Sequence, residues 1–174
     1  MFKHKNNLPF GADKFLAAFE GIEGGFAIGA GILAGLSFAG LDRKILLMTA
    51  VISIIVNGFN AAAVKYSTEH YLDELDGRET RRRFHQYFLP SLVEFVFYFL
   101  ISLVSIIPLI VMPSVTAAIA YTCVVTVLIL FVAGYWRAYL LGMPRWRDAT
   151  ETVLLGLGIV GVGLSAGWLI HHFA

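Results

Sequence analysis

The chain has 174 residues, of which 58% are hydrophobic and 14% are charged, and its formal net charge at pH 7 is +1. This composition is too apolar for one water-soluble core, so it excludes an ordinary soluble domain and indicates a polytopic membrane protein. A nucleic-acid-binding function is also excluded, because it would need a basic face on a soluble module.

Five stretches reach the roughly 17–25 residues that a helix needs to cross the hydrocarbon core of a membrane. They are residues 14–38, 45–66, 88–111, 115–137 and 150–170. They leave no room for a soluble domain. The sequence therefore predicts one all-α transmembrane domain over residues 1–174, integral to a cell membrane or a vacuole-type membrane and surrounded by lipid.

The basic residues predict the orientation of these helices, since cytoplasmic loops carry an excess of lysine and arginine. Most of them lie before the first stretch, between the second and third, or between the fourth and fifth: Lys3, Lys5, Lys14, Arg78, Arg81, Arg82, Arg83, Arg137, Arg145 and Arg147. The other two loops contain only Arg43 and Lys44. We therefore expect the N-terminus in the cytoplasm and the C-terminus on the opposite side.

The first stretch contains two carboxylates, Glu20 and Glu23, within an apolar and glycine-rich run. An ionisable side chain is costly to bury in a membrane, so such residues are typical of ion paths, proton relays or buried ion pairs. At about 1.5 Å per residue they lie roughly 8 and 12 Å inside the cytoplasmic end of the helix. Their i, i+3 spacing places them on one face.

Glycines recur at four-residue spacing in the first and last stretches. The pairs are Gly25 and Gly29, Gly31 and Gly35, and Gly163 and Gly167. Small residues at this spacing let two helix backbones approach closely, but the spacing does not say which helix is the neighbour. Packing within one chain and a seam between two copies both remain open, and we expect a homodimer that forms through the glycine-rich first helix.

The second and third stretches bring further oxygen atoms to the depth of the two glutamates. Asn57 and Asn60 lie about 8–14 Å from the cytoplasmic end of the second stretch, and Glu94 lies roughly 9 Å inside the third. Oxygen ligands suit divalent cations and protons, so these residues with Glu20 and Glu23 form a candidate metal or proton site. Alternatively, the asparagines hydrogen-bond between helices, and the glutamates reach interfacial water or stay protonated.

Other charged side chains lie near the end of the second stretch. Lys65 is predicted to reach Glu20, where its ammonium occupies charge space that a metal needs. In the loop that follows, His70 and Glu74 have the i, i+4 spacing of a weak metal-capture pair, together with acidic neighbours such as Glu69. A solvated extension of the helix is the favoured interpretation of this segment.

Residues 20–31 read Glu-Gly-Ile-Glu-Gly-Gly-Phe-Ala-Ile-Gly-Ala-Gly. This run resembles the first-helix motif of the vacuolar iron transporter family, in which an Asp-Gly pair is followed by Phe-Ala and a glycine. The layout of the third to fifth stretches is also similar, with Ile-Pro-Leu at 107–109 and Trp136 beside Arg137. The likeness extends over nearly the whole chain.

The second stretch keeps only part of the family's Ser-Met-x-x-Gly-Glu-Tyr-x-Ser motif. Tyr66 and Thr68 match its tyrosine and its final hydroxyl residue. Ala61 stands at the methionine, which is a soft sulfur ligand, and Lys65 stands at the glutamate. Two expected ligands are therefore missing, and at one of these positions the sign of the charge is reversed.

The resemblance implies a five-helix dimer that exchanges Fe²⁺ or Mn²⁺ for protons and moves the metal out of the cytosol, with no permanently bound cofactor. Glu20 would take the role of the motif's aspartate as a metal or proton ligand. The short loop after Tyr66 resembles the short members of the family, which lack a glutamate-rich cytoplasmic domain.

Two other classes of function are alternatives to transport. The first is a degenerate, non-transporting member, in which Lys65 neutralises Glu20 or Glu23 and the protein has a structural or interaction role. The second is a membrane enzyme, which we do not expect. The spans contain no paired nucleophile and base, no His-Glu-x-x-His and no phosphate-binding glycine loop.

Overall fold

The computed structural model describes residues 11–77 and 84–173, which form five long α-helices and no strand. The helices are α1 (Ala12–Leu36), α2 (Arg43–Leu75), α3 (Leu89–Val111), α4 (Val115–Leu141) and α5 (Arg145–Phe173). A 3-10 turn, η1 (Ser37–Ala39), follows α1, and a π-helical turn, η2 (Phe84–Phe88), leads into α3. All five helices are long and apolar enough to cross a membrane, which confirms the predicted all-helical membrane fold.

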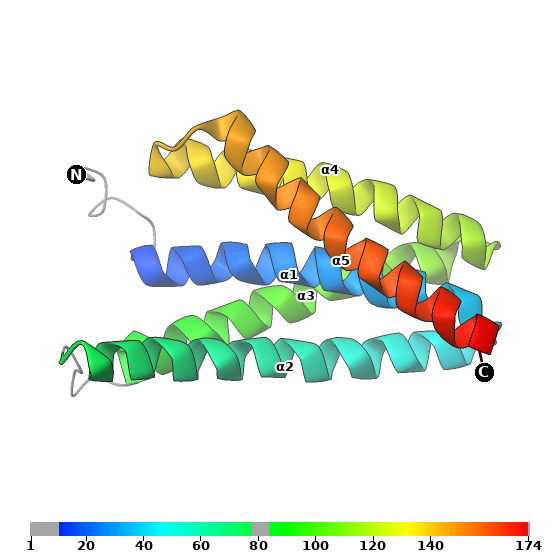
Figure 1. The fold of residues 1–174 in the computed structure, drawn as a ribbon, viewed down its shortest axis with the longest axis horizontal. Coiled ribbons are helices and arrows are strands. Elements are labelled where there is room, and N and C mark those ends of the chain that lie inside the picture. The colour runs from blue at the N-terminus through cyan, green and yellow to red at the C-terminus, as the bar shows by residue number, and fades with distance from the viewer. Residues whose placement is uncertain (1–10, 78–83, 174) are drawn as a thin grey trace.

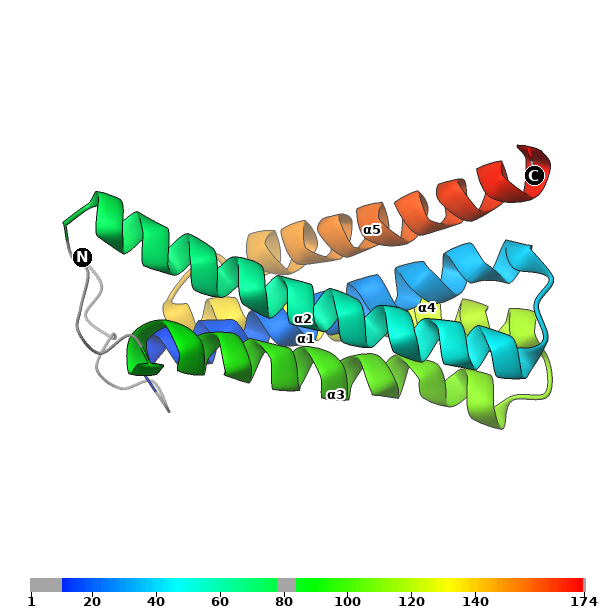
Figure 2. The same ribbon diagram turned by 90° about the horizontal axis from the view of Figure 1, so that it is seen from below.

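Successive helices run in opposite directions, so the start of α1 and the end of α5 lie at opposite ends of the bundle (Figure 1). α1 packs against all four other helices, with α3 and α5 on opposite sides of it (Figure 2). Which end faces the cytoplasm stays a prediction. Several basic residues on which it depends, Lys3, Lys5, Arg78, Arg81, Arg82 and Arg83, lie outside the described residues.

Three helices are longer than the predicted spans, and α4 is one of them, because it continues past residue 137 to Leu141. α2 continues past Tyr66 to Leu75, so His70 and Glu74 lie on a helical extension, as the favoured interpretation had it. It ends near Gly77, whose φ of 66° is left-handed and favours glycine. α5 begins at Arg145 rather than residue 150, because its polar first turn follows a proline and includes an acidic residue, both of which suit a helix N-terminus.

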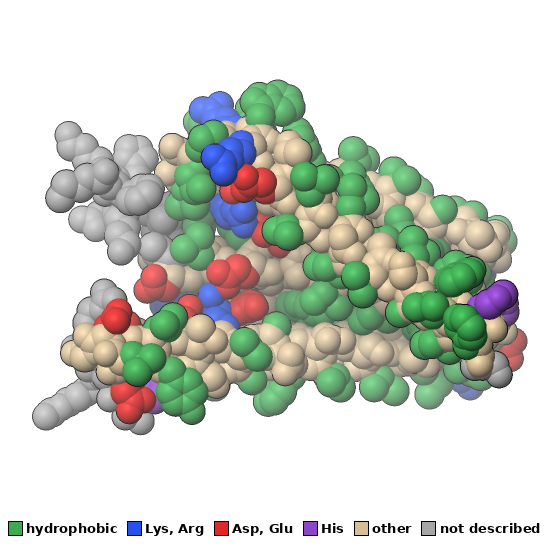
Figure 3. Space-filling view, viewed as in Figure 1, with side chains coloured by type: hydrophobic (Ala, Val, Ile, Leu, Met, Phe, Trp, Pro, Cys, Tyr) green, Lys and Arg blue, Asp and Glu red, His purple; other side chains and the backbone are tan. Residues whose placement is uncertain are grey.

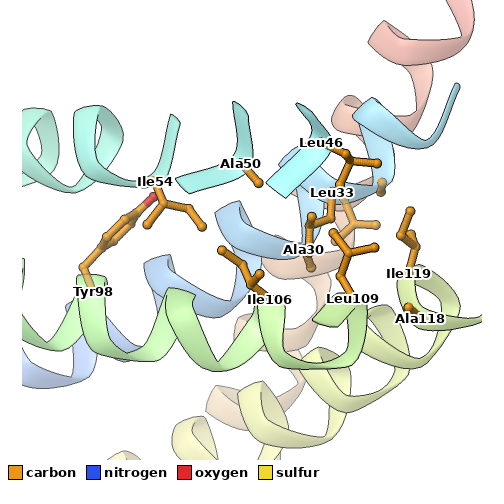
Figure 4. Packing of buried hydrophobic residues seen from close by; sticks show 12 residues of the cluster. Ala30, Leu33, Leu46, Ala50, Ile54, Tyr98, Ile106, Leu109, Ala118 and Ile119 are labelled. Carbon is orange, nitrogen blue, oxygen red and sulfur yellow. The ribbon is translucent and has the colours of Figure 1, made fainter. Parts of the chain in front are cut away.

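The main apolar core extends from the middle of α3 toward the turns that join α1 to α2 and α3 to α4. Figure 4 shows Tyr98 and Ile54 at one end of this cluster and Leu33, Leu46 and Leu109 toward the other. Charged side chains gather mainly in the opposite half, around the start of α1 and the end of α2 and over the turn between α4 and α5 (Figure 3). Large apolar side chains remain exposed on α2 to α5, as expected where lipid covers a protein.

The glycine pairs of α1 and α5 pack against each other within the chain. A Cβ atom on Gly163 would lie 2.2 Å from the carbonyl oxygen of Gly31, and one on Gly167 would lie 2.2 Å from that of Gly35. Gly25 is pressed against α3 in a similar way, at 2.7 Å from a backbone oxygen. Contacts inside one chain therefore account for the spacing. The homodimer stays a prediction to which these glycine faces add no evidence.

We predict that Gly163→Ala lowers the free energy of unfolding by about 1–3 kcal/mol, because the added methyl group fits only if α1 and α5 move apart. Gly158→Ala is the matched control, since it lies on the same helix and a Cβ there has no neighbour within 4 Å. Unfolding in detergent, followed by circular dichroism, measures both. Equal stability of the two variants would argue against the backbone contact between α1 and α5.

Candidate cation site

Lys65 connects α2 to α1 through Glu20, the first glutamate of α1. Its ammonium is ion-paired with Glu20 and also lies 3.1 Å from Oε1 of Glu69, one turn further along α2. The Lys65 side chain is only 12% exposed, whereas that of Glu20 is 48% exposed. The predicted contact between Lys65 and Glu20 is thus present. Glu69, considered from the sequence only as a neighbour of the weak capture pair, belongs to this group.

A cavity of about 460 Å³ opens beside this ion pair, between α1, α2 and α3. Its polar lining residues are Glu20, Asn60, Lys65, Thr68, Glu69 and Glu94. Three carboxylates and one ammonium carry a net charge of −2 when all are ionised. The cavity is therefore rich in oxygen ligands and attracts cations.

Glu94 is the most enclosed carboxylate of this cavity. Its residue is 8% exposed, and its Oε2 atom has no hydrogen-bond partner among the described residues. A buried polar atom without a partner is costly, and such atoms are rare in folded proteins. The free oxygen of Glu94 is therefore an unused ligand position in the wall of the cavity.

The second glutamate of α1 does not line this cavity. Both carboxylate oxygens of Glu23 accept hydrogen bonds from Nη1 of Arg137 in α4, at 2.6 and 2.7 Å. The same guanidinium donates to Oδ2 of Asp148 in α5 from Nε and Nη2, at 3.1 and 2.9 Å. Nη2 also lies 3.3 Å from Oγ1 of Thr152. These side chains connect α1, α4 and α5 through one mostly buried network.

The sequence alone does not predict this network. Arg137 enters the prediction of helix orientation and the family resemblance but no candidate site, and Asp148 lies just before the predicted fifth span. The sequence does place a basic residue, Arg137, and an acidic residue, Asp148, close to the loop between the fourth and fifth stretches. Because charges in a membrane are paired, this signal could have suggested a contact between Arg137 and Asp148.

The two asparagines lie in different environments. Asn60 lines the cavity with Glu20 and Glu94. Asn57 donates from Nδ2 to the backbone oxygen of Ser53 at 2.9 Å, and it lines a separate, largely apolar cavity of about 740 Å³ between α1, α2 and α5. Of the five predicted oxygen ligands, the structure therefore brings three together. The remaining two, Glu23 and Asn57, lie outside this cavity.

A second, largely apolar cavity lies on the other side of α1. Its volume is about 240 Å³, and its lining includes Glu20, Glu23 and Thr152 with apolar residues of α4 and α5. Glu20 thus lines both cavities, and Glu23 lines only the smaller one.

No three His, Cys, Asp or Glu side chains in the described part of the chain lie close enough to hold a metal ion as they are placed. In the larger cavity, Lys65 holds Glu20 and Glu69. His70 of the predicted capture pair packs against the rings of Tyr66 and Tyr87, at centroid distances of 6.0 and 5.2 Å. A metal at Glu20 therefore requires the ammonium of Lys65 to move.

A sequence model of the VIT family matches residues 69–168 of this chain, from the end of α2 into the last turns of α5. The matched segment includes Glu69, Glu94, Arg137 and Asp148, whereas Glu20 precedes it. No curated protein matches the chain significantly.

We predict that Arg137→Gln destabilises the fold by about 3–5 kcal/mol, because it leaves two mostly buried carboxylates, Glu23 and Asp148, without a cation. Adding Glu23→Gln to this variant should recover part of the loss. Arg147→Gln is the control, since it breaks an exposed ion pair with Glu151 and should cost less than about 1 kcal/mol. Equilibrium unfolding in detergent measures all three, and similar losses at the two arginines would show that the network contributes little.

Proposed function

The chain belongs to the VIT family of membrane transporters. We propose that it exchanges a divalent metal cation, Fe²⁺ or Mn²⁺, for protons. The family match and the five apolar helices together make it an integral membrane protein. The proposed metal is a transported substrate, and the proposal includes no resident cofactor.

The cavity between α1, α2 and α3 is the observation that carries this proposal. Carboxylate and amide oxygens of Glu20, Asn60 and Glu94 line it together. Hard oxygen ligands suit Mn²⁺ and Fe²⁺ better than they suit soft ions such as Cu⁺. The oxygen of Glu94 has no partner among the described residues, so it gives an entering cation a ligand that none of them occupies.

Exchange with protons follows from the chemistry of these ligands. A carboxylate binds a metal only when it is ionised, so protons and metal compete for Glu20 and Glu94. Protons that bind on one side favour release of the metal, and their loss on the other side prepares the site for the next ion. Glu23 was also predicted as a ligand, but it can take part only after Arg137 releases its oxygens.

The direction of transport is part of the proposal. With the N-terminus in the cytoplasm, the cavity lies in the cytoplasmic half of the membrane, because Glu20 is near the start of α1 and Glu69 near the end of α2. Metal would then enter from the cytosol and leave on the far side. The homodimer implied by the resemblance remains part of this proposal.

A specific observation favours a second candidate function. Lys65 places a positive charge inside the cavity and is paired with two of its carboxylates. If this ammonium never leaves, it neutralises the site, and the protein is a non-transporting member with a structural or interaction role. The two candidates differ in whether the cavity binds a divalent ion at all.

We predict proton-driven flux of Mn²⁺ or Fe²⁺ in proteoliposomes, with protons moving in the opposite direction. Glu20→Gln and Glu94→Gln should each lower this flux at least about tenfold, because each removes a charged ligand. Glu151→Gln is the matched control, since this exposed glutamate of α5 is paired with Arg147 and lies outside the cavity. Wild-type flux no greater than that of empty liposomes, with folded protein, would favour the non-transporting alternative.

We also predict that Lys65→Glu strengthens divalent binding by about tenfold or more, because it removes a like charge and adds a ligand. Calorimetric titration of the purified protein with Mn²⁺ measures the effect. Unchanged affinity would show that Lys65 does not compete with the metal. The same titration of the wild type tests whether the site binds metal before any substitution.

A further inference from the structure

Lys65 has two acceptors that belong to different helices. One is Glu20 of α1, and the other is Oε1 of Glu69, which lies four residues further along α2 at 3.1 Å. The lysine stem is flexible, and its ammonium is a compact charge that can turn from one acceptor to the other. Rotation of side-chain bonds therefore changes the partner of Lys65 without a shift of either helix.

The two acceptors of Lys65 differ in where they lie and in how exposed they are. This difference determines the acceptor toward which the ammonium turns. Glu69 stays beside Lys65 whatever the position of α2, because residues four apart on a helix are neighbours. Glu20 lies on another helix and lines the cavities on both sides of α1. It is also the more exposed partner, at 48% against 34% for Glu69. An entering cation therefore meets Glu20 more readily than Glu69.

A cation at Glu20 repels the ammonium of Lys65, and the Lys65 side chain is only 12% exposed. Without a second acceptor, its displacement would leave a nearly buried charge unpaired, which is strongly unfavourable. Glu69 removes most of this cost, because it pairs with the displaced ammonium. Once Lys65 and Glu69 form a neutral pair, Glu20 and Glu94 remain with two negative charges, which balance the two positive charges of a divalent ion.

We propose that Lys65 is a resident counter-ion that the transported cation displaces from Glu20, and that Glu69 is the acceptor to which it withdraws. Glu69 is then a positioning residue that acts through Lys65 and does not touch the metal. This inference rests on the proposed function. It is supported independently by the buried and unpartnered oxygen of Glu94, which points to a ligand in the same cavity.

A lysine at this position is compatible with transport. When no metal is present, Lys65 pairs with Glu20 and Glu69, so these two carboxylates of the cavity do not remain unpaired in the membrane. It does not block the site, because its second acceptor lies on its own helix. A monovalent cation compensates only one of the two charges on Glu20 and Glu94, so the arrangement favours divalent ions.

A double-mutant cycle on the full chain in detergent tests this assignment. The affinity for Mn²⁺ is measured, from the electron paramagnetic resonance signal of the free ion, for the wild type, Glu69→Gln, Lys65→Gln and the double variant. We expect Glu69→Gln to weaken binding about tenfold when Lys65 is present, because the ammonium is then confined to Glu20, and about twofold or less when Lys65 is absent. Lys65→Gln alone should strengthen binding.

Two further variants keep the test decisive. Glu69→Asp retains the acceptor and should bind Mn²⁺ within about threefold of the wild type, which separates loss of the carboxylate from loss of the fold. Glu151→Gln changes another glutamate in an i, i+4 ion pair and should leave the affinity unchanged. Circular dichroism and gel filtration confirm that each variant is folded.

The outcomes distinguish failure of the inference from failure of the proposed function. If Glu69→Gln weakens binding equally with and without Lys65, or strengthens it, Glu69 is not the acceptor for a displaced ammonium, and the inference is wrong while metal binding stands. If none of the folded variants binds Mn²⁺, both the inference and the proposed function are overturned. Binding of Mn²⁺ with a Glu69 effect that depends on Lys65 supports both.

Discussion

The two glutamates of α1 each require a cation from another helix, and this requirement organises the charged half of the bundle. Lys65 of α2 meets Glu20, and Arg137 of α4 meets Glu23. An unpaired charge in the membrane would cost several kcal/mol, so the positions of α2 and α4 around α1 are coupled to these contacts. On the side of α5, close glycine contacts hold α1 in addition to the network of Glu23, Arg137 and Asp148.

The two glutamates of α1 have different roles, because Glu20 pairs with a lysine and Glu23 pairs with an arginine. The planar guanidinium of Arg137 binds Glu23 and Asp148 through several hydrogen bonds, which fixes three helices relative to one another. The ammonium of Lys65 is a point charge on a flexible stem and makes no such rigid arrangement. Glu23 is thus held in a structural network, whereas Glu20 faces a cavity and keeps a partner that can be exchanged. This difference explains how two carboxylates three residues apart can serve stability and transport separately.

The sequence predicted the level of the polar residues but not the directions in which they point. A rise of about 1.5 Å per residue was enough to bring Glu20, Asn60, Lys65 and Glu94 to one layer. The rotation of each helix about its axis was not predictable, so Asn57 was included although it lies outside the cavity. The pair of Arg137 and Asp148 was missed because each lies at the end of an apolar stretch, where charges are ordinarily solvated.

Anomalous diffraction from crystals grown with Mn²⁺ would locate the bound cation. We expect one manganese peak per chain in the cavity between α1, α2 and α3, within bonding distance of Glu20 and Glu94, with the Lys65 ammonium turned to Glu69. A manganese peak at Glu23 with Arg137 displaced would contradict this account. So would a cavity without manganese at saturating Mn²⁺, in which Lys65 still contacts Glu20.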